Sequence, residues 1–297
     1  MKVLVLGANG QLGRCLVDQL VDSDHESIFT SRLELDIADF LSTRSKITQI
    51  SPDVVINASA YTSVDDAEVE LEQADLVNHL AVANIAQICA DIDSVLVHIS
   101  TDYVFDGNAS IPYLEEAQTN PKTVYGQTKW LGELAVQQSG GKYLIIRTGW
   151  VFSEYGNNFM TTMLRLGQQR NELSIVGDQI GCPTYGQDLA GAIIAIVAKI
   201  ESKVYEYGAY HYCGDRPCSW YEFAGAIFNH AKQHGLKVPS RIHSISTADY
   251  PTPAKRPSYS VLDCSKLLAE FGIAASNWQK GIINALGRLD AQSTRDQ

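Results

Sequence analysis

Hydrophobic residues in the first half of the chain occur as short continuous runs, separated by longer stretches in which apolar residues recur every three or four positions. The continuous runs predict strands at residues 2–6, 27–31, 53–59, 94–101 and 142–152. The intervening stretches predict helices at residues 11–21, 36–50, 74–90 and 123–138. A strand without alternation is buried on both faces, and strands that alternate with helices form a parallel sheet with right-handed crossovers. The pattern therefore predicts an α/β fold around a parallel sheet.

A glycine-rich turn joins the first predicted strand to the first predicted helix. Gly7, Gly10 and Gly13 lie in the sequence GANGQLG. Residues without a Cβ permit a tight turn and let a diphosphate approach the backbone N–H groups, where the helix N-terminus adds a positive potential. We therefore expect a dinucleotide-binding domain with the doubly wound parallel sheet of the Rossmann fold.

The regular alternation ends near Val151, and prolines punctuate the shorter elements beyond it. We expect residues 1–150 to form the dinucleotide-binding domain, with a helix near 187–200 returning to pack on the sheet. Residues 151–186 and 201–297 are expected to form a smaller C-terminal substrate-binding domain.

Composition disfavours several kinds of partner. The 297 residues are 45% hydrophobic and carry a formal net charge of −11, which repels nucleic acid and anionic membranes. No apolar stretch of 18 residues is present, and the N-terminal apolar run is too short for a signal peptide. We expect a cytoplasmic protein whose cysteines are structural thiols. The six cysteines are at positions 15, 89, 182, 213, 218 and 264.

Tyr125 and Lys129 are four residues apart in a predicted helix, and Thr101 ends the fourth predicted strand. Residues four apart share a helix face, and ligands of such sheets bind beyond the carboxyl ends of the strands. Reducing a carbonyl needs a hydride, which a nicotinamide supplies, and a proton, which a phenol can donate. A neighbouring ammonium is expected to lower the pKa of the phenol. We therefore expect Thr101, Tyr125 and Lys129 to be catalytic, with Tyr125 and Lys129 also contacting the cofactor.

The residues after the second predicted strand bear on the choice of cofactor. NAD-selective sites of this kind place an acidic residue there, whereas this chain has Ser31 and Arg32. A hydroxyl and a guanidinium suit the 2′-phosphate of NADPH. NADPH is therefore the expected cofactor, and Glu34 and Asp36 keep NADH possible.

The glycine turn and the Tyr–Lys spacing resemble the extended short-chain dehydrogenase/reductase family. Seven further blocks in order along the chain resemble one branch of it, the dTDP-4-dehydrorhamnose reductases. In chain order they are NASAYTSVDDAE (57–68), STDYVFDG (100–107), VYGQTKWLGE (124–133), RTGWVF (147–152), VGDQIGCPTYGQDLA (176–190), SWYEFA (219–224) and KRPSYSVLDCSKL (255–267). The resemblance implies NADPH-dependent reduction of the C4 keto group of a dTDP-linked sugar.

The resemblance also implies roles for individual residues. In addition to the glycines and to Ser31 and Arg32, it implies that further residues lie along the cofactor. These are Gln11, Leu12, Asp36, Ile37, Ala60, Tyr61, Thr62 and Ile99. In addition to Thr101, the residues expected to face the substrate are Asp102, Tyr103 and Trp150. Arg256, preceded by Lys255, is the candidate contact for the substrate diphosphate.

Some members of this family are described as metal-linked dimers that use a glutamate of the first helix. The corresponding residue here is Cys15, and a thiol is a poor ligand for Mg²⁺. We therefore expect no metal site, and a monomer or a weak homodimer.

Two other functions remain open from the sequence. Relatives of this fold serve as non-catalytic NADP-binding regulatory subunits, such as the one that binds methionine adenosyltransferase. A reductase or epimerase acting on another nucleotide sugar is the second alternative. The intact Thr–Tyr–Lys set favours an enzyme.

Overall fold

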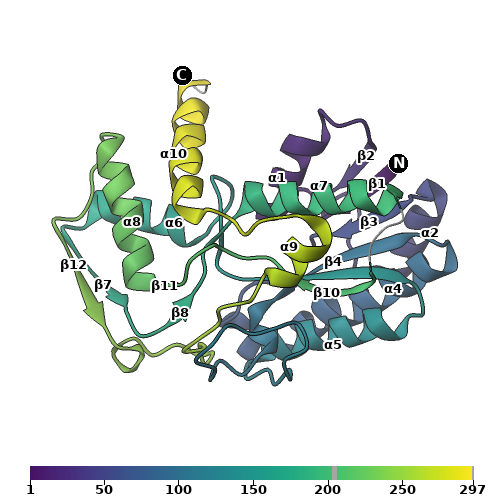
Figure 1. Cartoon of the computed structure of the whole chain (residues 1–297), viewed down its shortest axis with the longest axis horizontal. Helices are drawn as coiled ribbons and strands as arrows, with labels where there is room; N and C mark the ends of the chain where they lie inside the picture. The colour runs from purple at the N-terminus through teal and green to yellow at the C-terminus, as the bar shows by residue number, and fades with distance from the viewer. Residues whose placement is uncertain (203–205, 296–297) are drawn as a thin grey trace.

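A six-stranded parallel sheet forms the centre of the molecule, in the strand order β10-β5-β4-β3-β1-β2 (Figure 1). The computed structural model describes residues 1–202 and 206–295. The sheet strands are β1 (Lys2–Leu6), β2 (Glu26–Thr30), β3 (Val54–Asn57), β4 (Val95–Thr101), β5 (Lys142–Thr148) and β10 (Gly208–His211). The order reverses beside β1, as in a doubly wound sheet. The predicted Rossmann-type α/β fold is confirmed.

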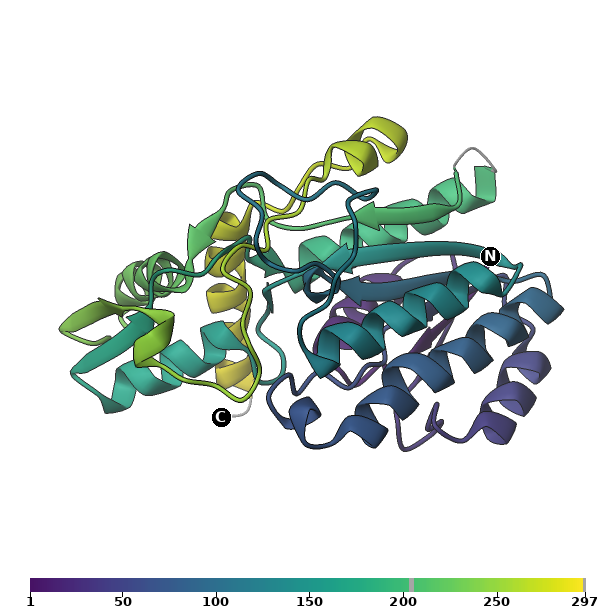
Figure 2. The ribbon, with the colours of Figure 1, turned by 90° about the horizontal axis from the view of Figure 1, so that it is seen from below.

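Helices cover both faces of the sheet, as Figure 2 shows. Val3, Val5 and Ile56 belong to one core cluster, whereas Leu4 and Val55 belong to the other. Successive strand residues thus enter opposite cores, which explains why these strands read as continuous apolar runs. The helices of the first cluster are α1 (Gln11–Leu20), α7 (Gly186–Ser202) and α9 (Ser265–Phe271). Those of the second are α2 (Phe40–Ile50), α4 (Ala81–Asp91) and α5 (Val124–Gln138). None of the described helices is long and apolar enough to cross a membrane.

The helix predicted at 74–90 is interrupted. It consists of α3 (Leu71–Asp75), a π-helical turn (Leu76–Leu80) and α4. The turn carries Asn78, which is fully buried. Apolar periodicity does not distinguish a π-helical turn from an α-helical one, so this local widening was not predicted.

Strand β10 and helix α9 come from the range 201–297 that the sequence assigns to the smaller domain. In the structure β10 pairs with β5, and Leu267 and Phe271 of α9 pack in the first sheet cluster. The strand is only four residues long and lies at the sheet edge, where pattern-based prediction is weakest. Residues 203–205 and 296–297 of that range lie outside the described residues.

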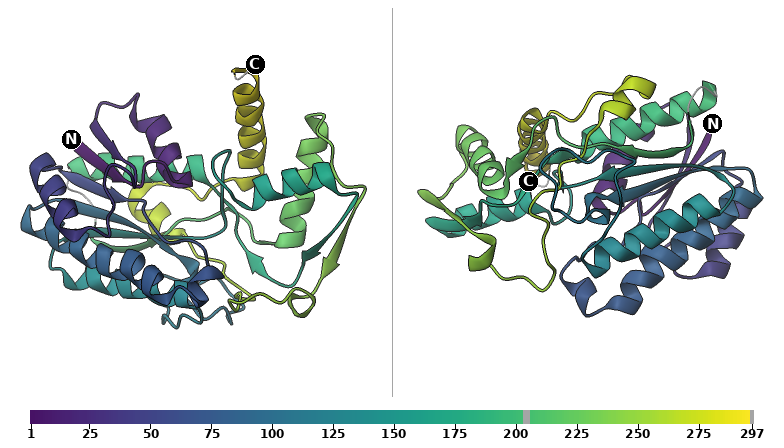
Figure 3. Two further views of the ribbon diagram at one scale, coloured as in Figure 1. Left: turned by 180° about the vertical axis from the view of Figure 1, so that it is seen from behind. Right: turned by 60° about the horizontal axis from the view of Figure 1, so that its bottom comes forward.

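The remaining elements build a smaller lobe beside the sheet (Figure 3). Its core is aromatic, with Phe152, Phe223 and Trp278 buried together. Its helices are α6 (Phe159–Gln169), α8 (Trp220–Gln233) and α10 (Trp278–Arg295). Its strands are β6 (Val151–Phe152), β7 (Glu172–Val176), β8 (Ile180–Gly181), β9 (Thr184–Tyr185), β11 (Cys218–Ser219) and β12 (Arg241–Ile245).

The chain passes from the sheet to the smaller lobe through a sharp turn, where a single strand 142–152 was predicted. Strand β5 ends at Thr148, and Trp150 has a φ of +51°, which strand geometry does not allow. A Cβ on Gly149 would lie 2.7 Å from Oδ2 of Asp102, so only glycine fits beside that carboxylate. The turn redirects the chain so that β6 pairs with β9.

A buried ion pair fixes α5 against the sheet. Arg147 of β5 donates from Nη2 to Oε2 of Glu133 at 2.7 Å, and Ser100 of β4 donates to Oε1 of the same carboxylate. The two charged side chains are 4% and 1% exposed. Because α5 carries Tyr125 and Lys129, this pair determines where both lie relative to β4.

Replacing Arg147 by alanine is expected to lower the free energy of unfolding by about 3–5 kcal/mol, because the Glu133 carboxylate would stay buried without its partner. Urea denaturation measures the change. The double variant Arg147→Met with Glu133→Leu should recover most of the loss, because it leaves no unpaired charge. A loss below ~1 kcal/mol in the single variant would contradict this account.

Candidate active site

The glycine turn brings β1, β2 and α1 together closely. Gly7 has a φ of +82° and donates its N–H to the carbonyl of Thr30 at 2.9 Å. A Cβ on Gly13 would lie 2.1 Å from the carbonyl oxygen of Gly7, so the first turn of α1 can pack against this carbonyl only with glycine at position 13. Glycine is thus required at both ends of the turn.

The N-terminus of α1 has the features of an anion site. The helix begins at Gln11 after Gly10, which has no side chain, so the first N–H groups, which have no intrahelical partners, also lack a side-chain acceptor from the cap residue. The side-chain Nε2 of Gln11 is buried and has no hydrogen-bond partner among the described residues. Backbone and side-chain donors without acceptors fit the diphosphate of a dinucleotide. Gln11 and Leu12, expected along the cofactor, form the first turn of this helix.

The residues after β2 are partly engaged with one another. Ser31 donates from its hydroxyl to Glu34 at 2.7 Å, and hydrogen bonds from Ser31 lower the pKa of that carboxyl. Arg32 pairs with Asp36 through Nε at 3.2 Å, and its side chain is 76% exposed, whereas that of Asp36 is 40% exposed. Ile37 is buried in the second sheet cluster. Arg32 therefore presents an accessible guanidinium at the carboxyl end of β2.

Asn78 holds the segment after β3. Its Oδ1 accepts from the N–H of Tyr61 at 2.9 Å, and its Nδ2 donates to the carbonyl of Tyr61 at 3.0 Å. The Tyr61 hydroxyl donates to Glu70, and Thr62 is exposed. Ala60, Tyr61 and Thr62 thus form a fixed loop at the carboxyl edge of the sheet. Asn78 was not predicted, because nothing in its sequence context marks the π-helical turn.

Thr101 and Tyr125 meet at the end of β4. Thr123 caps α5 by accepting from the N–H of Gly126 at 3.0 Å, and Glu68 accepts from the N–H of Val124 at 2.9 Å. A Cβ on Gly126 would lie 2.3 Å from the carbonyl oxygen of Tyr103, so α5 packs directly on the turn that follows Thr101. Tyr125, the second residue of α5, therefore lies next to the turn that begins after Thr101. The predicted convergence of strand end and helix start is present.

Burial raises the pKa of Tyr125, and this effect outweighs the lowering effect of Thr101. The direction is opposite to the expectation that Lys129 lowers it. Burial also lowers the pKa of Lys129 from its ordinary value of 10.5 to about 8, against the opposing effect of Glu133. Desolvation disfavours the charged form of each group, and sequence spacing gives no measure of it. Tyr125 therefore keeps its proton at neutral pH, the form that a proton donor needs.

Lys129 is held from the strand side. Its Nζ donates to the carbonyl oxygen of Ile99 at 2.7 Å and lies 3.5 Å from Nε2 of His98. Burial first, and then the charge of Lys129, lower the pKa of His98 well below its usual value. Ile99, expected behind the cofactor, thus orients Lys129 through its backbone.

A second group of side chains continues from Tyr125 toward the C-terminal part of the chain. The ring of Tyr103 meets that of Tyr125 edge-on, with centroids 5.5 Å apart. Arg256 donates to the Tyr103 hydroxyl at 3.1 Å and pairs with Asp65 at 2.5 Å. Asp102 is buried, which raises the pKa of its carboxyl to about 6, and its Oδ1 accepts from the hydroxyl of Thr101 at 3.0 Å.

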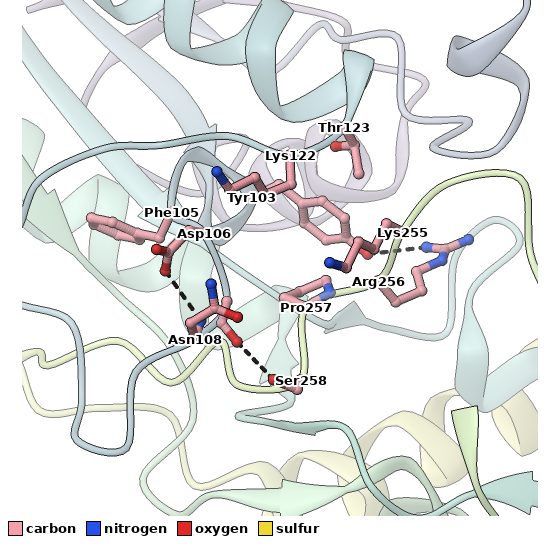
Figure 4. A pocket seen from close by; sticks show the side chains of 11 residues that line it. Tyr103, Phe105, Asp106, Asn108, Lys122, Thr123, Lys255, Arg256, Pro257 and Ser258 are labelled. Atoms are coloured by element: carbon pink, nitrogen blue, oxygen red, sulfur yellow. Dashed lines mark hydrogen bonds between the residues drawn. The ribbon is translucent and has the colours of Figure 1, made fainter. Parts of the chain in front are cut away.

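A small cavity of about 70 Å³ lies beside Tyr103, and Figure 4 shows the side chains that line it. Three cationic side chains line it: Lys122, Lys255 and Arg256. Asp106 is the acidic residue of the lining. The excess of positive charge suits an anionic ligand. Lys122 and Asp65 were not predicted, although Asp65 lies in one of the blocks that carried the resemblance.

Trp150 lies in the turn between the sheet and the smaller lobe. It stacks on Trp220 with centroids 3.4 Å apart, and Trp220 donates from Nε1 to Gln179 at 3.1 Å. A Cβ on Gly181 would lie 2.4 Å from the Trp150 ring. The segments that carry Trp220 and Gly181 therefore fix Trp150, and its contact with a sugar remains a prediction.

The residues around Cys15 do not fit Mg²⁺. Cys15 is fully buried, and burial raises the pKa of its thiol to about 12, so it remains protonated. The nearest carboxylates, Asp18 and Glu154, already pair with Arg288. Within residues 1–202 and 206–295, no group of three or more histidine, cysteine, aspartate or glutamate side chains is placed to hold a metal.

A Rossmann sheet with a glycine turn, and a Thr–Tyr–Lys set at its carboxyl edge, define the short-chain dehydrogenase/reductase class. The family model described as the RmlD substrate binding domain matches residues 1–291. A dTDP-4-dehydrorhamnose reductase of Aggregatibacter actinomycetemcomitans is 45% identical, over 95% of this chain and 97% of that protein. The chain belongs to the dTDP-4-dehydrorhamnose reductase family.

Solved structures agree with this assignment. The crystal structure of a dTDP-4-dehydrorhamnose reductase from Clostridium acetobutylicum superposes with a TM-score of 0.91 at 38% identity, covering 98% of this chain and 100% of that one. The Bacillus anthracis enzyme, described as a complex with NADP, has a TM-score of 0.88 at 36% identity, with coverage of 97% and 99%.

The lowered pKa of Lys129 predicts a pH-dependent stability difference. Below pH 8 the Lys129 ammonium is charged in both the folded and the unfolded states, so its burial lowers the free energy of unfolding by the full amount, roughly 3 kcal/mol. Between pH 8 and 10.5 the Lys129 side chain is neutral in the folded state and still charged in the unfolded state, so this destabilisation decreases as the pH rises. Lys129→Met should therefore be more stable than the parent at pH 7, with the advantage shrinking toward pH 10.5. Urea denaturation across this range tests it, and a constant difference would contradict it.

Proposed function

We propose that this protein reduces the C4 keto group of dTDP-4-dehydro-L-rhamnose with NADPH, giving dTDP-L-rhamnose for cell-surface polysaccharide synthesis. The observation that carries the proposal is that α5 packs directly on the turn after Thr101, which brings the hydroxyls of Tyr125 and Thr101 to the same sheet edge as the glycine turn. A carbonyl oxygen held by both hydroxyls would lie at the edge where the dinucleotide binds.

The cofactor, when bound, supplies the hydride. The N–H groups of the first turn of α1 and the free Nε2 of Gln11 would bind its diphosphate. Lys129, held by the carbonyl of Ile99, would bind the nicotinamide ribose beside Tyr125. The remaining residues proposed to line the cofactor are Gly7, Gly10, Leu12, Gly13, Ser31, Arg32, Asp36, Ile37, Ala60, Tyr61 and Thr62.

Tyr125 would transfer its phenolic proton to the oxygen that becomes the C4 hydroxyl, and Thr101 would orient that oxygen. Because the pKa of Tyr125 is raised, the donor is protonated throughout the neutral range. A phenolate formed in this buried site is costly, so rapid return of a proton is needed. Lys129, with a pKa of about 8, can exchange protons in this range and is the proposed source.

The substrate would extend from Tyr125 toward the smaller lobe. Asp102, Tyr103 and Trp150 are proposed to contact the sugar. Arg256 is proposed to bind the diphosphate, because its guanidinium reaches Tyr103 and forms part of the cationic lining next to it. A monomer or weak homodimer in a reducing cytoplasm completes the proposal, consistent with six free cysteines in the described chain.

Absorbance of NADPH in the presence of dTDP-4-dehydro-L-rhamnose measures the proposed reaction directly. Oxidation of NADPH with formation of dTDP-L-rhamnose would support the enzyme. Binding of NADPH without turnover would favour the regulatory subunit instead. Turnover only with a GDP- or UDP-linked keto sugar, or purification with tightly held NAD⁺, would favour the other nucleotide-sugar enzymes.

Tyr125→Phe should lower kcat by about 10²–10⁴-fold, because it removes the proton donor, with little change in the Kd for NADPH. Tyr143→Phe removes a hydroxyl at the opposite, amino end of β5 and serves as the matched control. Steady-state kinetics and NADPH fluorescence titration give the two quantities. Turnover of Tyr125→Phe equal to that of the control would remove Tyr125 from its role.

Arg32→Ala should raise the KM for NADPH about tenfold while leaving the KM for NADH nearly unchanged, since only NADPH carries the 2′-phosphate. Arg44→Ala, which removes a surface guanidinium paired with Asp91, is the control. Equal effects of Arg32→Ala on both cofactors would place the 2′-phosphate elsewhere.

A further inference from the structure

A polar network joins four distant segments of the chain on the α1 side of the sheet. Arg288 of α10 donates from Nη1 to Oδ2 of Asp18 in α1 at 2.9 Å, and the same nitrogen lies 3.4 Å from Oε1 of Glu154, just after β6. Gln187 of α7 completes the set. Its Nε2 donates to Asp18 at 2.7 Å and to Glu154 at 2.9 Å.

The two carboxylates are close neighbours, because both accept from one nitrogen atom of Gln187. The Glu154 side chain is 0% exposed and that of Asp18 is 28% exposed. Each also accepts from a tyrosine, Glu154 from Tyr185 at 3.2 Å and Asp18 from Tyr155 at 2.8 Å. Two adjacent carboxylates repel each other, and burial makes an uncompensated charge costly.

Arg288 pairs with both carboxylates. Its side chain is 46% exposed, so one side of the guanidinium remains in contact with water while Nη1 faces the acidic pair. The guanidinium cannot lose its charge at any physiological pH. Gln187 contributes donors but no charge. The network as a whole therefore carries one positive and two negative charges.

Cys15 lies at the edge of the same network. A Cβ on Gly186, the residue before Gln187, would lie 3.1 Å from Sγ of Cys15. The charges of Glu154, Asp18 and Arg288 all act on its thiol. The position where the family resemblance places a metal ligand is therefore next to a pair of carboxylates that already has a cation.

We propose that Arg288 is a built-in counter-cation, which occupies the place between Asp18 and Glu154 that a divalent ion would otherwise hold. The chain supplies this positive charge from its own α10, and it does so across the junction between the sheet and the smaller lobe. Stability and oligomeric state of this protein are therefore independent of Mg²⁺.

Thermal unfolding of the full chain with 10 mM MgCl₂ or with EDTA tests the proposal. The parent should show the same Tm in both conditions. Arg288→Ala should have a lower Tm in EDTA and regain several degrees with MgCl₂, because an ion that binds only the folded state stabilises it. Arg288→Lys keeps a positive charge and should show little response to MgCl₂. Arg44→Ala, which removes a guanidinium from an exposed pair, should show none.

Two outcomes would overturn the proposal. One is a parent protein whose Tm rises with MgCl₂, or whose sedimentation coefficient falls in EDTA, since the native chain would then still use the metal. The other is an Arg288→Ala variant that folds and shows no response to MgCl₂, since the carboxylates would then need no cation. If Arg288→Ala does not fold, Arg288→Gln provides the same comparison with most of the side-chain volume retained.

Discussion

Close contact between helix α5 and the end of strand β4 is the constraint on which the site depends. Gly126 and Gly132 let the helix approach the backbone of Tyr103 and Asn78 within distances that a Cβ would not permit. The buried Glu133–Arg147 pair prevents the helix from sliding along the sheet. With the helix fixed in this way, Tyr125 lies beside the turn after Thr101, and Lys129 donates to the carbonyl oxygen of Ile99. The residues that fix α5 on the sheet therefore also determine where the proposed catalytic side chains lie.

The fold could be predicted wherever local sequence determines it. Strands β1, β3, β4 and β5 are buried on both faces, so their apolar runs mark them without reference to the rest of the chain. The glycine turn is equally local. Strand β10 could not be predicted, because it forms by pairing with β5, far from it in sequence. The turn at Gly149 and Trp150 could not be predicted, because it packs against the distant carboxylate of Asp102. Tertiary contact outweighs local preference at both places.

The candidate site follows the same rule. The spacing of Tyr125 and Lys129 is a property of one helix, so it was evident from the sequence. Their pKa directions were not, because desolvation depends on what covers each group after folding. The pairs Asp65–Arg256 and Asp18–Arg288 join residues 191 and 270 positions apart, and no pattern along the chain indicates such partners.

The stacked indole rings of Trp150 and Trp220 form a contact between the two lobes that fluorescence can detect. One ring comes from the turn that leaves the sheet, and the other begins helix α8 of the smaller lobe. Any rotation between the lobes changes their overlap, and the emission of stacked indoles is sensitive to overlap. The unlabelled protein therefore contains an intrinsic fluorescent reporter of how the two lobes are oriented, without an engineered dye.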